Sequence, residues 1–271
     1  MKLSYLGRAE RIKEMVEINL NNKLAVVTGA ARGLGKAVAL KYAQAGADVW
    51  LGDIREDELK ETVEEIKQYG VKCGYSICDV TKYDQCESML EEAGKVDILA
   101  HVAGIMISRP MLEMEQDQID RIIKVNVNGT DNICRAGLRK MIPNRAGTIL
   151  VTSSVAGRHG HPGHAHYHLT KAADISIMQS AALVGAPYGV TVNAICPGII
   201  RTAIWEHILD NTRKDGETRE ECWERSIREM IPLGRPQSAD DIADAVLFLT
   251  SPMARNITGQ ALNVCGGMEM N

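Results

Sequence analysis

The chain has 271 residues, of which 45% are hydrophobic and 4% aromatic, and it carries a formal net charge of −4. This length and composition suit one large α/β domain with a sizeable core. Lys and Arg are spread along the chain rather than clustered, and aromatic residues are few, so no nucleic-acid partner is expected.

Neither a secretory signal nor a membrane segment is predicted. Charges interrupt residues 1–18, and no stretch reaches the roughly 20 apolar residues that cross a bilayer. The seven cysteines are scattered and form no C-x-x-C pair. This cysteine usage is typical of reduced thiols, and we expect a cytoplasmic protein.

Apolar strands alternate with amphipathic helices along the chain. The first strand, Leu24–Gly29, precedes a helix over Gly35–Ala45, and the second, Ala47–Asp53, precedes a helix over Glu56–Tyr69. Further strands are predicted at Val71–Val80, Val96–Gly104, Gly147–Ser154, Val190–Gly198 and Ala261–Gly267. Such alternation indicates a parallel sheet with helices on both faces. We therefore predict an α/β fold, a single doubly wound, Rossmann-like domain over residues 1–271, whose ligands bind at the carboxyl ends of the strands.

The turn between the first strand and its helix has the sequence TGAARGLG, from Thr28 to Gly35. Its glycines allow a tight turn and a close backbone approach, and the helix N-terminus offers free N–H groups to a pyrophosphate. Taken alone, the stretch could be no more than a tight turn. Its spacing is T-G-x-x-x-G-x-G rather than the usual dinucleotide-binding G-x-G-x-x-G.

This spacing resembles the short-chain dehydrogenase/reductase family, and the family's other motifs follow in order. Asn126 lies in KVNVNG, Ser154 precedes Tyr167 by thirteen residues, and Tyr167–Lys171 reads Y-x-x-x-K. Pro197–Thr202 matches P-G-x-x-x-T, and ITGQALNVCGG resembles the family's closing strand. The resemblance covers residues 20–267.

The resemblance implies a catalytic tetrad of Asn126, Ser154, Tyr167 and Lys171. A free tyrosine, with a pKa of about 10, is a poor base at neutral pH, and an adjacent ammonium favours the phenolate. Tyr167 and Lys171 stand at i and i+4, on one helix face. We expect Tyr167 to be the general acid/base and Lys171 to favour its phenolate and hold the nicotinamide ribose. Ser154 would hydrogen-bond the substrate oxygen, and Asn126 would hold a relay water.

Asp53 favours NAD over NADP. At the end of the second strand its carboxylate can bind the adenosine ribose and would repel a 2′-phosphate, by up to ~4 kcal/mol at about 4 Å and an effective dielectric constant of ~20. Arg32, and more weakly Arg55, could pair with that phosphate instead, so NADP is the less favoured cofactor. The other cofactor contacts implied by the resemblance are Gly29, Gly33, Leu34, Gly35, Asp79, Val80, Ala103, Gly104, Tyr167, Lys171, Pro197, Gly198, Ile200 and Thr202.

Two residues depart from the family pattern without touching the tetrad. His101 replaces the first Asn of the family's N-N-A-G, a side chain that braces the central sheet. We expect His101 to brace the sheet in its place. Cys265 stands where the family usually has Asp.

Five of the seven histidines lie between Arg158 and Lys171, at positions 159, 161, 164, 166 and 168. This segment joins Ser154 to Tyr167, so we expect it to form one wall of the substrate pocket, with His159 and His161 contacting substrate. His164 and His168 have the i, i+4 spacing of a metal pair on a helix. No nearby Cys, Asp or Glu completes a ligand set, so no metal is expected.

Residues 203–231 occupy the position of the family's substrate lid, and Trp205 is the lid side chain expected to contact substrate. The lid is similar to that of acetoin and polyol dehydrogenases, which favours a small polyol or an acetoin-like secondary alcohol or ketone. Its apolar side chains leave a hydroxysteroid dehydrogenase open, and an NADPH-dependent 3-oxoacyl thioester reductase is a further alternative.

A non-catalytic dinucleotide-binding scaffold is the alternative of another class, and the complete tetrad argues against it. Family members commonly form dimers or tetramers, so a homo-oligomer, a tetramer or dimer, is expected. Residues 1–20 form an N-terminal extension that could add to such an interface.

Overall fold

The computed structural model describes residues 18–201, 205, 209 and 212–270. Most of the N-terminal extension, Thr202 and residues 203–204, 206–208 and 210–211 of the lid lie outside these described residues. Within them, no helix is long and apolar enough to span a membrane.

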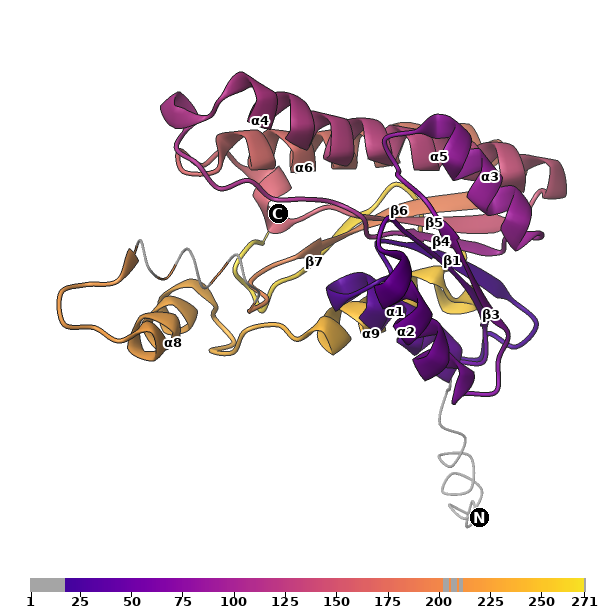
Figure 1. The fold of residues 1–271 in the computed structure, drawn as a ribbon, viewed down its shortest axis with the longest axis horizontal. Coiled ribbons are helices and arrows are strands. Elements are labelled where there is room, and N and C mark those ends of the chain that lie inside the picture. Colours follow the sequence, from indigo (N-terminus) through magenta and orange to yellow (C-terminus); the bar gives the residue numbers. More distant parts are fainter. Residues whose placement is uncertain (1–17, 202–204, 206–208, 210–211, 271) are drawn as a thin grey trace, which may run out of the picture.

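A parallel, seven-stranded sheet forms the centre of the described part of the chain, with strand order β3-β2-β1-β4-β5-β6-β7 (Figure 1). The predicted α/β fold with a doubly wound, Rossmann-like sheet is confirmed. The strands are β1 (Leu24–Thr28), β2 (Asp48–Asp53), β3 (Cys73–Ile77), β4 (Ile98–His101), β5 (Gly147–Thr152), β6 (Val190–Pro197) and β7 (Ala261–Val264).

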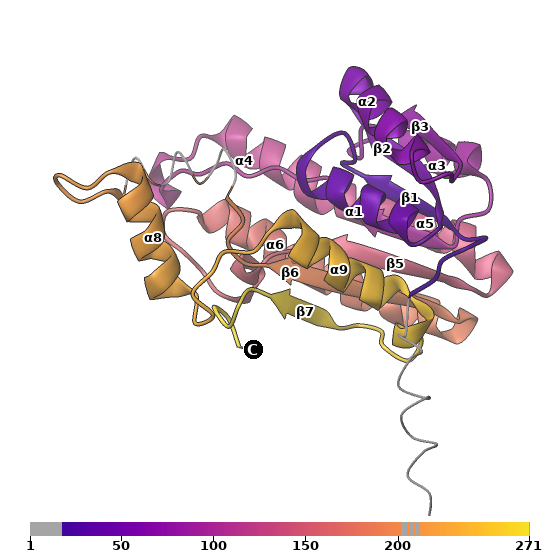
Figure 2. The same cartoon turned by 90° about the horizontal axis from the view of Figure 1, so that it is seen from below.

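Helices cover both faces of the sheet (Figures 1 and 2). One face carries α1 (Gly33–Gln44), α2 (Glu56–Lys67) and α9 (Ala239–Thr250). The other carries α3 (Tyr83–Ala93), α4 (Gln116–Ile122), α5 (Gly129–Met141) and α6 (Ala165–Gly185). Each layer has its own buried apolar cluster, with Tyr42 and Val246 in the first and Met89 and Met178 in the second.

All the strands except β2, which ends at Asp53 as predicted, end earlier than the sequence pattern predicts. β4 ends at His101 rather than at Gly104, because the N–H groups of Val102 and Ala103 donate to the Thr28 hydroxyl instead of to a neighbouring strand. The apolar run therefore continues past the strand into a loop at the carboxyl edge of the sheet. That edge is where a doubly wound sheet binds its ligand.

His101 braces the central strands, as expected from the sequence. It pairs in register with Thr28 across β1 and β4, and its Nδ1 lies 2.7 Å from the Thr28 hydroxyl oxygen. Both side chains are buried.

The helix α8 (Arg219–Met230) stands away from the sheet layers beside the carboxyl edge of the sheet (Figure 1). Thr218 caps its N-terminus in a reciprocal capping box with Glu221. Its apolar face packs in a small cluster of its own, which includes Ile199, Leu209 and Trp223. The second half of the predicted lid is thus an ordered helix held against the end of β6.

Candidate active site

The turn after β1 brings three backbone segments close together. Gly29 has φ +69°, and a Cβ at this position would lie 2.7 Å from the backbone nitrogen of Ala103. A Cβ at Gly35 would overlap the carbonyl oxygen of Gly29. Arg32 precedes α1 without a side-chain cap, and no acidic residue lies in the first turn of the helix. The N–H groups of the first turn of α1 are therefore open to an anion such as a pyrophosphate.

Asp53 lies beside this turn with a fixed carboxylate. Its Oδ2 accepts from the backbone N–H of Ala31 at 3.2 Å. Its Oδ1 accepts from the N–H groups of Ile54 at 2.7 Å and Arg55 at 3.2 Å. The side chain of Arg32 is exposed. The structure therefore places a negative charge next to the turn.

Asp79 and Val80 follow β3 along the same edge. Asp79 accepts from the N–H of Thr81 at 3.0 Å, and its own N–H donates to the side chain of Gln85. The carbonyl of Val80 accepts from Asn132 of α5. This loop is thus held between α3 and α5.

Asn126 lies in one turn of π-helix, Ile123–Asn128, between α4 and α5. Its Oδ1 accepts from the N–H of Ile105 at 2.8 Å, and its Nδ2 donates to the carbonyl of Ile105 at 2.8 Å and to the hydroxyl of Thr170 at 3.0 Å. Both amide hydrogens are used, and one lone pair of Oδ1 remains for a further donor. Asn126 therefore joins the loop after β4 to α6.

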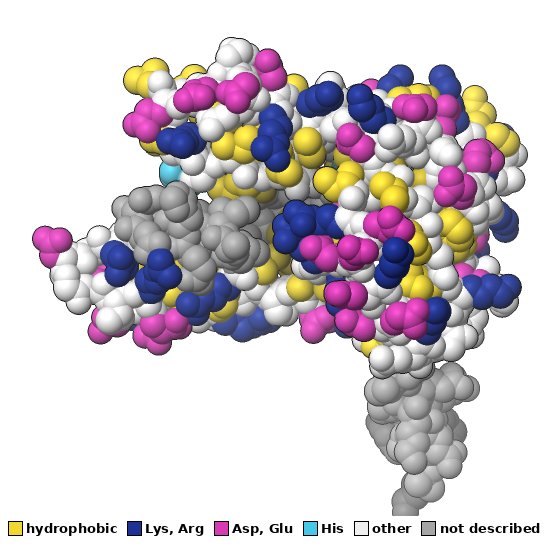
Figure 3. Space-filling model, viewed as in Figure 1, with side chains coloured by type: hydrophobic (Ala, Val, Ile, Leu, Met, Phe, Trp, Pro, Cys, Tyr) yellow, Lys and Arg dark blue, Asp and Glu magenta, His cyan; other side chains and the backbone are white. Residues whose placement is uncertain are grey.

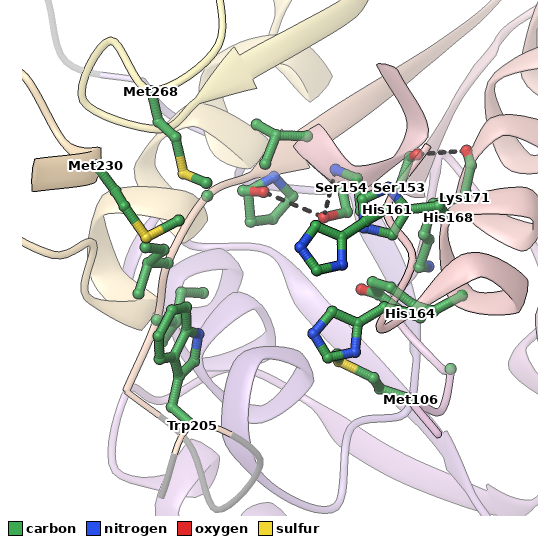
Figure 4. A pocket seen from close by; sticks show the side chains of 18 of the residues that line it. Met106, Ser153, Ser154, His161, His164, His168, Lys171, Trp205, Met230 and Met268 are labelled. Carbon is green, nitrogen blue, oxygen red and sulfur yellow. Dashed lines mark hydrogen bonds between the residues drawn. The ribbon is translucent and has the colours of Figure 1, made fainter. Parts of the chain in front are cut away.

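Ser154 and Ser153 follow β5 but differ in their hydrogen bonds (Figure 4). The Ser153 hydroxyl donates to the backbone carbonyl of Lys171 at 2.7 Å and is buried. The Ser154 hydroxyl accepts from the N–H of Ala156 at 3.1 Å and lies 3.5 Å from the carbonyl of Pro197. Ser154 thus has the freer hydroxyl of the two, in line with its predicted role.

Tyr167 and Lys171 lie one turn apart at the start of α6. The Nζ of Lys171 is 5.9 Å from the centroid of the Tyr167 ring. The ammonium donates to the carbonyl of Thr152 at 2.9 Å and to Asp174 Oδ2 at 2.9 Å. Burial, the largest influence, lowers the pKa of Lys171, but the charges of Asp174 and Tyr167 and the hydrogen bond to Asp174 together raise it above the ordinary value. Lys171 is therefore a cation at neutral pH.

A cavity of about 630 Å³ opens above these side chains. Much of its wall is apolar, and in Figure 4 Trp205, Met230 and Met268 lie on the side opposite His161 and His164. The predicted site residues that line it are Leu34, Gly104, Ser154, His159, His161, Tyr167, Lys171, Pro197, Gly198, Ile200 and Trp205. The other predicted cofactor residues that the structure describes lie along the same edge of the sheet, at the end of β2, at the start of α1 and in the loops after β1, β3 and β4.

Four histidines form one wall of this cavity, two more than the sequence assigned to it. The rings of His161, His164 and His168 stack, with centroids 5.0 to 6.5 Å apart. His159 makes an edge contact with His168, and its Nδ1 lies 3.0 Å from a carboxylate oxygen of Glu269. We call His159, His161, His164 and His168 the histidine wall.

Hydrogen bonds fix the proton positions of two rings in this wall. His161 Nδ1 accepts from the N–H of Gly163, so the neutral ring carries its proton on Nε2. His168 Nδ1 lies 2.6 Å from the carbonyl of His159, which only accepts, so His168 carries its proton on Nδ1. Burial, followed by the neighbouring imidazoles, lowers the pKa of His164. Burial is also the main cause that lowers the pKa of His168. These two rings are therefore uncharged at neutral pH.

Among the described residues, no three His, Cys, Asp or Glu side chains are arranged to hold a metal ion. His164 Nδ1 lies 3.0 Å from the hydroxyl of Ser108, in the loop after β4. The i, i+4 pair of His164 and His168 thus stacks within the wall and ties α6 to that loop.

Sequence reasoning missed several side chains of the site. Met106, Met230 and Met268 come from separate segments, and no local pattern brings them together. Asp174 carried a readable signal: it is an acidic residue on the inward side of a helix, three positions after Lys171.

Comparisons with known proteins agree with this geometry. A family profile described as "Enoyl-(Acyl carrier protein) reductase" matches residues 29–269. The chain is 33% identical over 255 residues to the 3-oxoacyl-[acyl-carrier-protein] reductase FabG of Thermotoga maritima, covering 93% of this chain and 99% of that protein. It is 36% identical over 253 residues to FabG of Staphylococcus aureus, covering 92% and 98%. A solved short-chain type dehydrogenase/reductase from Mycobacterium marinum superposes with a TM-score of 0.82 at 31% identity, covering 93% of this chain and 97% of that one. The chain belongs to the short-chain dehydrogenase/reductase family.

Two further solved structures are similar in fold. An NAD⁺-bound xylitol dehydrogenase superposes with a TM-score of 0.85 at 30% identity, covering 92% of this chain and 99% of that one. A variant of the actinorhodin polyketide ketoreductase with NADPH superposes with a TM-score of 0.84 at 28% identity, covering 91% and 97%. This short-chain dehydrogenase/reductase is therefore an oxidoreductase. Of the two similar structures, the xylitol dehydrogenase is bound to NAD⁺ and the ketoreductase to NADPH.

Proposed function

We propose that this enzyme transfers a hydride between NAD and a secondary alcohol or ketone that has a bulky apolar body, such as a hydroxysteroid. One observation carries the proposal: Ser154, Tyr167 and Lys171 converge on a cavity of about 630 Å³ whose wall is largely aliphatic, thioether and aromatic. Such a wall gains free energy by covering apolar substrate surface, at about 25 cal/mol per Å². A polyol would lose hydrogen bonds to water against it.

The residues of the turn fit a dinucleotide. A Cβ at Gly29 or Gly35 would fill the space that lets the backbone approach closely, and the N-terminus of α1 offers N–H groups for the pyrophosphate. Asp53 would hold the adenosine ribose, and Lys171 the nicotinamide ribose. When bound there, the nicotinamide supplies or accepts the hydride.

The chain's own residues handle the proton and orient the substrate. The Ser154 hydroxyl donates to the substrate oxygen and fixes it beside Tyr167. Tyr167 gives a proton to that oxygen in reduction and removes it in oxidation. The Lys171 ammonium stabilises the phenolate form, and Asn126 holds the loop after β4 and offers Oδ1 to a relay water.

Asp53 supports NAD as the cofactor. Its carboxylate already accepts three backbone N–H groups, so it cannot readily turn away from a 2′-phosphate. The NAD⁺-bound state of the structurally similar xylitol dehydrogenase is in line with this proposal.

A 3-oxoacyl thioester reductase is the second candidate, because FabG proteins are among the curated relatives and an acyl chain also suits an apolar cavity. The cofactor separates the two, since we expect that reductase to use NADPH. The third candidate is a dehydrogenase of a small polyol or acetoin, which the lid sequence favours and the likeness to xylitol dehydrogenase supports.

A reduced-nicotinamide absorbance assay tests these candidates. Purified enzyme would be given NAD or NADP with hydroxysteroids, xylitol and other polyols, acetoin, and 3-oxoacyl thioesters, and Tyr167→Phe serves as the inactive control. We expect NAD-linked turnover of a hydroxysteroid or similar alcohol. Turnover of thioesters with NADPH alone would replace the proposal with the second candidate, and turnover of polyols alone with the third.

We also propose that the enzyme forms a dimer or tetramer. The outer side of α6 exposes Leu169, Leu183 and Val184, which is unusual for a helix facing water. On the face drawn in Figure 3, Lys and Arg alternate with Asp and Glu over the described residues, and this mixture does not suggest a nucleic-acid partner. Light scattering of the purified chain gives the number of copies.

A further inference from the structure

A buried carboxylate lies directly against the lysine of the proposed catalytic centre. Asp174 is 1% exposed and Lys171 is 6% exposed. Asp174 Oδ2 lies 2.9 Å from Lys171 Nζ, and Asp174 Oδ1 lies 2.7 Å from the hydroxyl oxygen of Thr130 in α5. The same hydroxyl oxygen lies 2.6 Å from the backbone carbonyl of Asn126. One hydrogen-bonded network therefore joins Lys171, Asp174 and Asn126.

Asp174 also restricts where the Lys171 ammonium can donate. An ammonium has three N–H donors. One is directed to Asp174 and one to the carbonyl of Thr152, both at 2.9 Å. The third is left for the cavity that Lys171 lines beside Tyr167.

His101, Cys134 and Cys196, which pack around Lys171 and Asp174, add no charge to this pair at neutral pH. Burial and the charge of Lys171 lower the pKa of His101, on β4, to about 3, so this ring is neutral. Burial raises the pKa of the Cys134 thiol on α5 and of the Cys196 thiol on β6, so both stay protonated. Thr130, Thr152 and Ser153 do not titrate.

We propose that Asp174 is a positioning residue of this active site: it orients the Lys171 ammonium, and its negative charge sets the pH at which Tyr167 and Lys171 together release a proton. The inference rests on the proposed general acid/base role of Tyr167. With Asp174 present, the buried Lys171–Asp174 pair has no net charge, so the phenolate receives less stabilisation than from an unpaired ammonium. The enzyme therefore needs a more alkaline pH for alcohol oxidation than it would without Asp174.

The direction in which the pH midpoint moves does not depend on whether Tyr167 or Lys171 loses the proton. Tyr167 and Lys171 interact closely, so the proton released belongs to the pair. Removing a nearby negative charge favours the deprotonated pair whether the remaining proton stays on oxygen or on nitrogen. Neutralising Asp174 must therefore lower the pH midpoint, by about one to two units for a charge at this distance.

Asp174→Asn is the direct test. The side-chain oxygen of the new Asn can accept from Lys171, and its NH₂ group can donate to the Thr130 hydroxyl. That hydroxyl then donates its own proton to the Asn126 carbonyl. Alcohol oxidation, as kcat/KM, would be followed against pH for the wild type, Asp174→Asn and the charge-preserving Asp174→Glu. We expect the midpoint to fall in Asp174→Asn and to return to the wild-type range in Asp174→Glu. A midpoint that stays or rises in Asp174→Asn, or that falls equally in Asp174→Glu, would overturn the proposal.

A second readout keeps the test independent of turnover. Phenolate absorbance is titrated in the wild type and in Tyr167→Phe, and the difference isolates Tyr167 from the other six tyrosines. The same pair of titrations is repeated in the Asp174→Asn background, with Asp174→Ser as a second neutral variant should the first not fold. The Tyr167 signal should move to lower pH in the neutral variant, and an unmoved signal contradicts the inference. If the wild type oxidises no alcohol, the proposed function fails, while this titration still decides the role of Asp174.

Discussion

The Thr28 hydroxyl and His101 Nδ1 lie 2.7 Å apart in the middle of the sheet and fix the proton positions of both side chains. The Thr28 oxygen accepts the N–H groups of Val102 and Ala103, so its own proton points to Nδ1. The neutral His101 ring then carries its proton on Nε2. That nitrogen is buried and has no hydrogen-bond partner among the described residues.

His101 should make the fold sensitive to acid. Burial, with the charge of Lys171, lowers the pKa of His101 from 6.5 to about 3. As the pH falls below 6.5, the unfolded chain takes up this proton and the folded chain does not, so stability is lost down to about pH 3. The loss from this one group approaches about 1.4 kcal/mol per pH unit.

The His101→Asn variant removes this titration. We expect it to cost about 1 kcal/mol at pH 7 through lost packing and to flatten the decline between pH 6 and pH 4. Urea unfolding of both proteins at pH 7, 6, 5 and 4 measures the two slopes. Equal slopes would show that other groups govern acid unfolding.

Ser154 and Ser153 provide a matched pair of substitutions in the active site. Ser154→Ala removes the hydroxyl proposed to bind the substrate oxygen, and we expect kcat to fall about 100-fold. Ser153→Ala removes a hydrogen bond to the backbone of Lys171, and we expect about 1 kcal/mol of lost stability with most of the turnover retained. Steady-state kinetics and thermal unfolding of both variants separate the two roles, and a larger kcat loss in Ser153→Ala would reverse the assignment.

Asp53 should control the choice of cofactor. Asp53→Asn removes the charge that opposes a 2′-phosphate and weakens the ribose contact, so we expect kcat/KM for NAD to fall about 10-fold and that for NADP to rise by a similar factor. The measurement is kcat/KM with each dinucleotide at a fixed substrate concentration. Asp57→Asn is the control, because Asp57 lies close by at the start of α2 with its side chain 98% exposed. An unchanged ratio in Asp53→Asn would remove the basis for NAD.

The sheet and the proposed tetrad could be read from the sequence because their signals are local. Apolar runs ending in glycine predict the strands, and Y-x-x-x-K predicts a Tyr–Lys pair on one face of α6. The walls of the cavity could not be read in this way. Met106, Met230 and Met268 are far apart in sequence, and only the packing of α8 and the final segment against the edge of the sheet brings them together.

The histidine wall was predicted only in part for a related reason. The sequence placed the histidines between Ser154 and Tyr167, but which rings enter the cavity depends on the turn before α6. His164 directly precedes α6 and His168 lies one turn later, so the rings of both stack against His161. His166 has an adjacent position in the sequence but does not line the cavity.

His161 of the histidine wall should bind substrate through its ring face and its Nε2–H. His161→Ala removes one stacked ring from the cavity, and we expect KM for the preferred substrate to rise about 5-fold to 10-fold, equivalent to about 1 kcal/mol, with a smaller effect on kcat. His166→Ala is the matched control and should leave KM near the wild-type value, because His166 lies outside the cavity lining. Since burial holds the pKa of His164 and His168 below the ordinary value, these two rings should contribute little to any change of KM between pH 7 and pH 8. A steep rise of KM over that pH range would mean that a protonated imidazole binds an anionic group of the substrate instead.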